Sequence, residues 1–266
     1  MSASVGLYTN DSSGVFQRSV IGGATEVAER AGLTVKVVEV HEQVASGAEA
    51  AAFTAGVLGS LVITNVFANE ALQSLLEAGH PVTLVSHRAQ GLHVPTVMHD
   101  NRQGVRQLVE HLVGAGRNRF VYIGGRSDQL DGRERERFFR EELMRHSLAM
   151  PPERFLAGDF EPQLAAESLR GLLTEGHDFD AVIAADYLMA IAALDALRGA
   201  AVRVPEEVSV VGFGDGPEAA AAGLTVVSAD VVELGRRGAR QLLAQVNGDR
   251  LRGYTVMRAG LIVRKS

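Results

Sequence analysis

Residues 208–215 have the sequence VSVVGFGD, a β-branched and apolar run that glycines interrupt and an acid closes. Such a run predicts a fully buried parallel strand, because a strand that helices cover on both faces carries no polar alternation. The glycines and Asp215 then form the loop at the carboxyl end of the strand, which is where ligands bind in open α/β sheets. The stretch therefore predicts an α/β fold with a ligand site at this edge.

The rest of the chain alternates strand and helix patterns, and this order is typical of parallel sheets flanked by helices. Strands are expected at residues 5–9, 34–40, 61–64, 82–86, 96–100, 120–123, 155–157, 181–184, 208–213 and 255–263. Helices are expected at residues 16–31, 47–58, 69–78, 103–114, 133–146, 163–174, 187–197 and 232–246. Two such series predict two lobes, and the absence of a low-complexity linker favours several tight interlobe crossings.

Composition limits the class of protein. The chain has 266 residues, 46% of them hydrophobic, which is enough for a large core. It has no cysteine, so disulfides and cysteine-ligated metals are excluded. We expect no signal peptide, and no window reaches the roughly 18 apolar residues of a membrane helix. We therefore expect a soluble, cytoplasmic protein without membrane contact.

The formal net charge is −6. Neutralising the phosphates of a nucleic acid requires a basic face, so the charge argues against direct nucleic-acid binding by these residues. We expect a small-molecule partner instead.

Several segments resemble the LacI/GalR family of transcriptional repressors. They are VPEEVSVVGF at 204–213, DNRQG at 100–104, VEHL at 109–112, FVYIGG at 120–125, GDF at 158–160, AD at 185–186 and LIVRKS at 261–266. One such match is weak, whereas this many in register over nearly the whole chain indicate both fold and function class.

The resemblance implies a two-lobe, periplasmic-binding-protein-like fold of type I. Its N-lobe would comprise residues 1–116 plus 229–250, and its C-lobe residues 117–228 plus 251–266. In this family an effector binds in the interlobe cleft of a homodimer, and closure acts on an upstream helix-turn-helix that binds operator DNA. That DNA-binding domain is expected to be absent from this chain.

The resemblance also implies ligand-binding residues. Arg135 matches the arginine that hydrogen-bonds the effector, and its five donors suit hydroxyl pairs or a carboxylate; the alternative is one arginine among several on a solvated helix. Asn10 and Phe16 match contacts near the first strand, with a helix cap and a buried staple residue as alternatives. Phe160 matches an aromatic platform for the apolar face of a sugar or base, or else a core residue.

Three acids complete the expected site. Asp100 and Asp215 are candidate acceptors whose alternative role is capping, and Asp186 matches the acid of the family's Asn-Asp pair, with a structural role as its alternative. The chain departs from the family pattern at Ala185, Gly214 and Ala229, where polar residues are usual. With three polar contacts missing, we expect a less hydroxylated or anionic effector, or a pocket that has lost its ligand.

No catalytic constellation is evident. The GFGDG at 212–216 lacks the spacing of a dinucleotide loop, and the pairs Ser86–His87 and His99–Asp100 do not form a triad. We expect no enzyme activity, no cofactor and no metal. The function predicted is the effector-sensing core of a transcription regulator; the alternatives are a solute-binding protein for transport, or a sensor or dimerisation module with a vestigial pocket.

Overall fold

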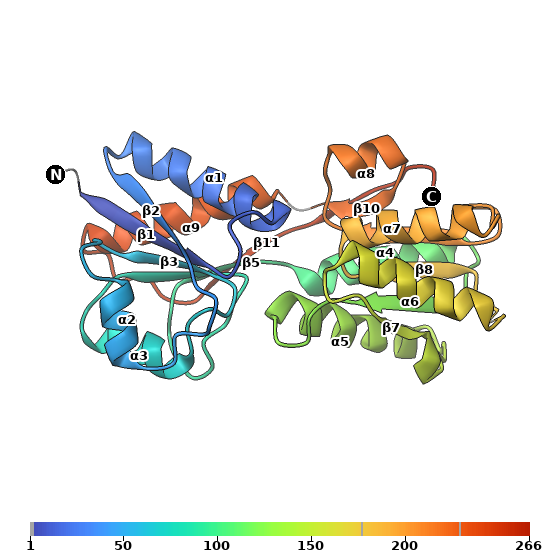
Figure 1. Ribbon diagram of the computed structural model, residues 1–266, viewed down its shortest axis with the longest axis horizontal. Helices are drawn as coiled ribbons and strands as arrows, with labels where there is room; N and C mark the ends of the chain where they lie inside the picture. Colours follow the sequence, from blue (N-terminus) through green and yellow to red (C-terminus); the bar gives the residue numbers. More distant parts are fainter. Residues whose placement is uncertain (1–2, 177, 229) are drawn as a thin grey trace. The chain divides into compact units, whose positions relative to one another are not determined.

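The computed structural model describes residues 3–176, 178–228 and 230–266, and the chain divides into two compact units (Figure 1). Unit 1 comprises Met1–His99 and Asp230–Met257, and unit 2 comprises Asp100–Ala229 and Arg258–Ser266. The lobe boundaries taken from the resemblance lay after residues 116, 228 and 250. In this division helix α4 (Asn101–Gly114) belongs to unit 2, and residues 251–257 belong to unit 1.

Unit 1 is built on a parallel sheet with the strand order β11-β5-β4-β3-β1-β2. Helices α1 and α9 cover one face of this sheet, and α2 and α3 cover the other (Figure 1). The strands are β1 (Ser4–Thr9), β2 (Thr34–Glu39), β3 (Ser60–Ile63), β4 (Val82–Val85), β5 (Thr96–His99) and β11 (Tyr254–Met257). The helices are α1 (Val15–Arg30), α2 (Gly47–Phe53), α3 (Asn69–Glu77) and α9 (Val231–Val246).

Helices α1 and α9 pack backbone against backbone. A Cβ added to Gly23 would lie 2.0 Å from the carbonyl oxygen of Val232, and one added to Gly235 would lie 2.1 Å from that of Val20. One glycine on each helix, Gly23 on α1 and Gly235 on α9, therefore allows the two backbones to approach closely. The two glycines are more than 200 residues apart in the sequence.

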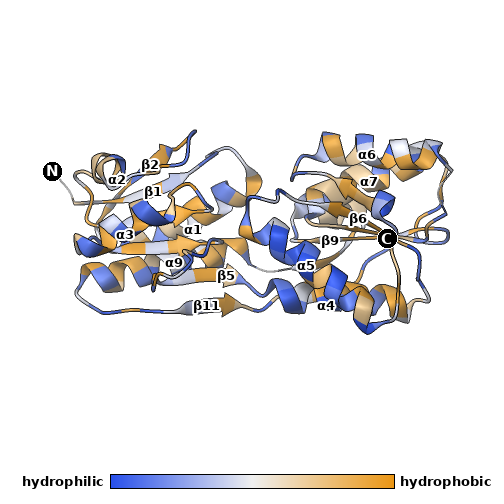
Figure 2. Ribbon diagram, turned by 90° about the horizontal axis from the view of Figure 1, so that it is seen from below, coloured by the Kyte–Doolittle hydropathy of each residue, from blue (hydrophilic) through white to orange (hydrophobic). Residues whose placement is uncertain are grey.

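Unit 2 repeats the plan, with the strand order β12-β10-β9-β8-β6-β7. Helices α4 and α5 lie on one side of its sheet, and α6 and α7 lie on the other (Figure 2). The strands are β6 (Phe120–Gly124), β7 (Phe155–Ala157), β8 (Ala181–Ala184), β9 (Ser209–Phe213), β10 (Thr225–Ser228) and β12 (Gly260–Ile262). The further helices are α5 (Leu130–Arg145), a 3-10 turn (Pro152–Arg154), α6 (Pro162–Thr174), α7 (Tyr187–Gly199) and α8 (Pro217–Ala222).

The predicted strand at 208–213 is confirmed as β9. It is buried along its whole length and pairs in parallel with β8 on one side and β10 on the other. The α/β class with parallel sheets flanked by helices is thus confirmed. In the ranges described, no helix has the length and apolarity needed to cross a bilayer.

The predicted strand at 255–263 was wrong as a single element. Its first part is β11, which lies parallel to β5 in unit 1, and its last part is β12, which lies antiparallel to β10 in unit 2. Arg258 and Ala259 separate the two strands, and neither is a turn-forming residue type. The break is therefore fixed by pairing in two different sheets, which periodicity does not reveal.

Candidate functional site

Arg135 is the centre of a buried polar cluster in unit 2. Its side chain lies on α5, and the residue is only 6% exposed. The guanidinium donates from Nε to Asn101 Oδ1 at 3.0 Å and from Nη1 to the carbonyl of Ala185 at 2.7 Å. Its Nη2 lies 3.5 Å from the Asp131 carboxylate, and its plane lies over the Phe213 ring at 3.8 Å from the centroid. The guanidinium is therefore held in one orientation by α4, α5 and the ends of β8 and β9.

Asn101 links this cation to two carboxylates. Its Nδ2 donates to Asp131 Oδ1 at 2.8 Å and to Glu134 Oε2 at 2.9 Å, and all three residues are buried. None of these three residues was among the predicted site residues. The available signal was the position of Asp131 four residues before Arg135, because residues four apart share a helix face. Glu134, directly before Arg135, and Asn101, on a different helix, carry no such signal.

Asp186 is the N-cap of α7. Its Oδ1 accepts from the Met189 N–H at 2.7 Å. Burial raises the pKa of the carboxyl to about 6, against the opposing effects of the Met189 N–H and the Arg135 charge. The capping geometry matches the structural alternative for Asp186, and the residue follows Ala185, whose carbonyl binds Arg135.

Phe160 lies on a strained turn after β7. Asp159 and Phe160 have φ of 50° and 61°, a left-handed conformation that costs energy in non-glycine residues and is often found at functional sites. The Phe160 ring lies over Gly125, because a Cβ added to this glycine would be 2.2 Å from a ring atom. The ring is half-buried and packs on the unit 2 core, so it combines the core role with a partly exposed aromatic surface.

The other two acids of unit 2 have structural partners. Asp100 caps α4, accepting from the Gln103 N–H at 2.9 Å. Asp215 accepts from Arg264 Nη2 at 2.8 Å and from the Gly216 N–H at 2.9 Å. The structure therefore brings Arg135 and Asp186 into one cluster, whereas the Asp215 carboxylate is bound to the C-terminal segment.

Unit 1 carries polar side chains at the carboxyl ends of three neighbouring strands. Asn10 Oδ1 accepts from Thr64 Oγ1 at 3.3 Å. Thr64 and Ser86 directly follow β3 and β4, with left-handed φ of 62° and 51°. Within the described residues the buried Ser86 Oγ has no hydrogen-bond partner. No sequence motif marks Thr64 or Ser86, because their distinguishing feature is a backbone angle.

Phe16, the remaining candidate, lies on α1. Its ring packs edge-on to that of His99, with centroids 6.4 Å apart, and the residue is partly exposed. Over the part of the chain that the structure describes, no group of three or more His, Asp or Glu side chains is placed to hold a metal ion.

The periplasmic binding protein-like domain family matches residues 109–266, which is more than half of the chain. The chain belongs to this family. Its curated relatives include the HTH-type transcriptional regulator CelR of Thermobifida fusca, 35% identical over 63% of this chain and 50% of CelR. The HTH-type transcriptional repressor MelR of Bacillus subtilis is 29% identical over 78% of this chain and 62% of MelR. The resemblance to LacI-type regulators is thus confirmed.

Solved structures of this family superpose over the chain. A CelR–cellobiose complex has a TM-score of 0.85 and 29% identity, covering 99% of this chain and 84% of that chain. A lac repressor dimer bound to operator and an anti-inducer has a TM-score of 0.88 at 20% identity, covering 100% of this chain and 81% of that chain, and supports the fold alone. The chain spans about half the length of the curated relatives it matches. The names of these relatives describe transcription regulators.

The departures from the family pattern can now be placed. Ala185 has no polar side chain, but its backbone carbonyl accepts a hydrogen bond from Arg135. Gly214 follows β9 with a φ of 94°, a conformation that favours glycine over the usual acid. Ala229 lies outside the described residues.

Proposed function

We propose that this chain is the effector-sensing core of a LacI-type transcription regulator and that its effector is a neutral, hydroxyl-rich molecule of the saccharide class. The observation that carries the proposal is the buried cluster of Arg135, Asn101, Asp131 and Glu134. The names of the relatives support regulation over solute transport, and cellobiose in the CelR complex supports a saccharide.

The charges of the cluster favour a neutral effector over an anionic one. One buried cation, Arg135, is accompanied by the buried carboxyls of Asp131 and Glu134 and by the partly buried carboxyl of Asp186. An anionic effector would add like charge to a poorly solvated, acid-rich group, which is costly. We therefore propose a neutral, hydroxyl-rich effector in place of the less hydroxylated or anionic one expected from the missing polar contacts.

The hydrogen-bonding capacity of the cluster suits hydroxyl groups. Carboxylates accept from hydroxyls, whereas a guanidinium donates to them. Two of the five N–H groups of Arg135 are used by Asn101 and Ala185, so the Nη groups retain donors. The half-buried Phe160 ring supplies an apolar face of the kind that packs on sugar rings. Within unit 1, the side chains of Asn10, Thr64 and Ser86 at the carboxyl edge of the sheet also carry groups that hydrogen-bond hydroxyls.

The remaining elements of the proposal concern the full-length protein. We infer that it joins this core to a helix-turn-helix that binds operator DNA, works in the cytoplasm and forms a homodimer. The effector would act by binding one conformation more tightly than another, since only differential affinity shifts a conformational equilibrium.

Calorimetric titration with cellobiose, glucose and glucose 6-phosphate tests the proposal. We expect a neutral sugar to bind. The Arg135→Lys substitution should lower the affinity for that sugar by at least about tenfold, because lysine keeps the charge but lacks the planar set of donors. The matched control is Arg140→Lys, an exposed arginine on the same helix that pairs with Glu136. Tighter binding of the phosphate, or equal binding by the two variants, would contradict the proposal. A folded chain that binds no saccharide would favour the vestigial-pocket alternative.

A further inference from the structure

Strand β11 forms an outer edge of the unit 1 sheet. Among the described residues it pairs with β5 alone, with Tyr254 opposite Thr96 and Met257 opposite His99. The Thr96 N–H donates to the Gly253 carbonyl at 3.1 Å. Since backbone groups alternate in direction along a strand, the N–H and C=O groups of Tyr254 and Val256 point away from β5.

This edge lacks the usual protection against strand pairing. Natural edge strands carry prolines, inward-pointing charges or bulges, and Tyr254–Met257 has neither proline nor charge. Tyr254 and Val256 are 55% and 47% exposed and lie on the same side of the strand. The Arg88 guanidinium lies 5.1 Å from the centroid of the Tyr254 ring.

The other side of β11 faces α9 and is basic. Gln241 Nε2 donates to Thr255 Oγ1 at 2.7 Å, and these two residues line a hollow of about 340 Å³ together with Arg237 and Arg240. The two arginine side chains are 47% and 52% exposed. The hollow thus presents two guanidiniums beside an open strand edge.

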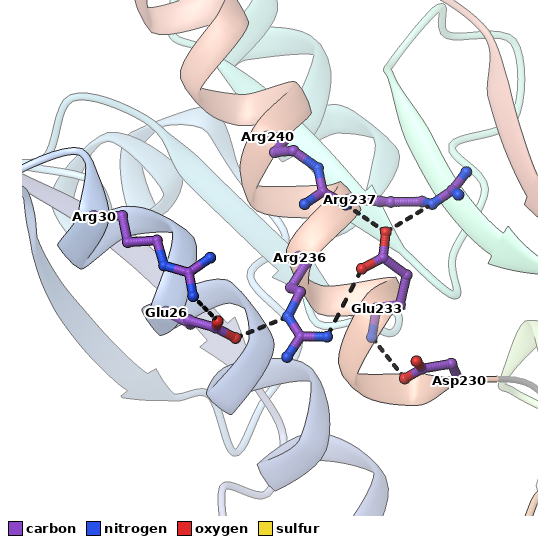
Figure 3. A network of polar contacts seen from close by, with 7 residues as sticks. All are labelled: Glu26, Arg30, Asp230, Glu233, Arg236, Arg237 and Arg240. Carbon is purple, nitrogen blue, oxygen red and sulfur yellow. Dashed lines mark hydrogen bonds and ion pairs between the residues drawn. The ribbon is translucent and has the colours of Figure 1, made fainter.

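The three arginines of α9 share two carboxylates, that of Glu233 on the same helix and that of Glu26 on α1, which lies 2.8 Å from Arg236 Nε. Figure 3 shows three arginines converging on Glu233. Arg237 Nε lies 3.1 Å from one carboxylate oxygen, which also accepts from Arg240, and Arg236 Nη1 lies 3.9 Å from the other. Residues 230–257 contain five arginines and three acids, a net charge of +2, within a chain whose net charge is −6. This surface therefore complements an acidic partner.

We propose that β11 and the adjoining face of α9 bind an extended, acidic segment of another polypeptide by β-strand addition. Main-chain hydrogen bonds to Tyr254 and Val256 supply affinity in this mode, and alternate side chains supply specificity. Residues of the partner on the α9 side meet Arg237 and Arg240, and the intervening residues meet Tyr254 and Val256. The partner sequence therefore alternates acidic and apolar residues.

The probe is a fluorescein-labelled peptide with the sequence Glu-Val-Glu-Val-Glu-Val-Glu, compared with Glu-Glu-Val-Val-Val-Glu-Glu of the same composition. Fluorescence anisotropy should show tighter binding of the alternating peptide. The double variant Arg237→Glu, Arg240→Glu should bind the alternating peptide about tenfold or more weakly, since each substitution replaces attraction to the peptide's glutamates by repulsion. Arg106→Glu, an exposed arginine on α4 paired with Glu110, is the matched control.

A second variant tests the backbone contact. Val256→Pro removes an N–H group that points away from β5 and leaves the hydrogen bonds between β11 and β5 in place. The variant should therefore keep the melting temperature of the parent protein but no longer bind the alternating peptide. The control Val256→Thr, which keeps the N–H group, should still bind the peptide. Equal binding of both peptides together with full binding by Val256→Pro would overturn strand addition. Self-association of the free protein that Val256→Pro abolishes in sedimentation velocity would also overturn the proposal, because the occupant would then be a second copy of the chain.

Discussion

Replacing Asp186 by asparagine should stabilise the protein at neutral pH while preserving the start of α7. Asp186 keeps part of its surface exposed, yet desolvation of its carboxyl is the main cause that raises its pKa to about 6. Asparagine keeps an oxygen that can accept from the Met189 N–H, so the cap survives, whereas the charge that burial penalises is removed.

The magnitude follows from the pKa. The carboxyl rises from an ordinary value of 3.8 to about 6, and each unit corresponds to about 1.4 kcal/mol, so ionising Asp186 in the folded state costs up to about 3 kcal/mol. The folded state holds this proton more tightly than the unfolded chain. This contribution of Asp186 to stability is therefore complete below about pH 4, declines as pH rises, and is lost by about pH 6 to 7.

Urea unfolding of Asp186→Asn and the parent protein, followed by circular dichroism from pH 4 to pH 7.5, measures the effect. The difference in free energy of unfolding should grow with pH to about 2 to 3 kcal/mol in favour of the variant at equal m-values. Asp100→Asn, at the partly exposed cap of α4, is the control for cap geometry and should change stability by less than about 1 kcal/mol. A difference that does not vary with pH, or a variant less stable at pH 7.5, would refute the reasoning.

Two further substitutions separate packing from ligand binding. Gly23→Ala should lower the melting temperature by several degrees, because the new methyl group would lie 2.0 Å from the Val232 carbonyl oxygen. The control is Gly22→Ala, whose added methyl group would have no atom within 4 Å and should leave stability unchanged or slightly higher. Differential scanning calorimetry compares the melting temperatures of the two variants. Asp215→Asn should lower stability by about 1 kcal/mol through loss of the Arg264 ion pair, while saccharide affinity in titration stays unchanged; a large loss of affinity would return Asp215 to the effector site.

The sequence was most informative where periodicity and burial coincide. The apolar run at 208–213 and the glycines after it predicted a buried parallel strand, because only a strand covered on both faces tolerates such a composition. The sequence was least informative where a distant partner decides the role. Asp215 was a candidate acceptor or cap, yet Arg264, 49 residues later, donates to its carboxylate.

The candidate site shows the same limit. Position and residue type singled out Arg135, but its contacts with Asn101 and Ala185 depend on how α4, α5 and β8 pack. Thr64 and Ser86 are ordinary residues in the sequence and become notable only through their left-handed backbone. Long-range pairing and backbone angles are not encoded in local composition, so neither was predictable.

The discontinuous course of the chain has a consequence for biosynthesis. Unit 1 takes five of its described strands from the first 99 residues, but α9 and β11 come from residues 231–257, after nearly all of unit 2. During translation, the first five strands of the unit 1 sheet therefore leave the ribosome before α9 has been synthesised. The glycine-containing face of α1, against which α9 packs, stays uncovered while unit 2 is made. Closing so long a loop late is slow, and exposed apolar surface favours aggregation in the interval. We expect nascent chains that stop before residue 231 to bind chaperones and those extended past residue 257 to be released.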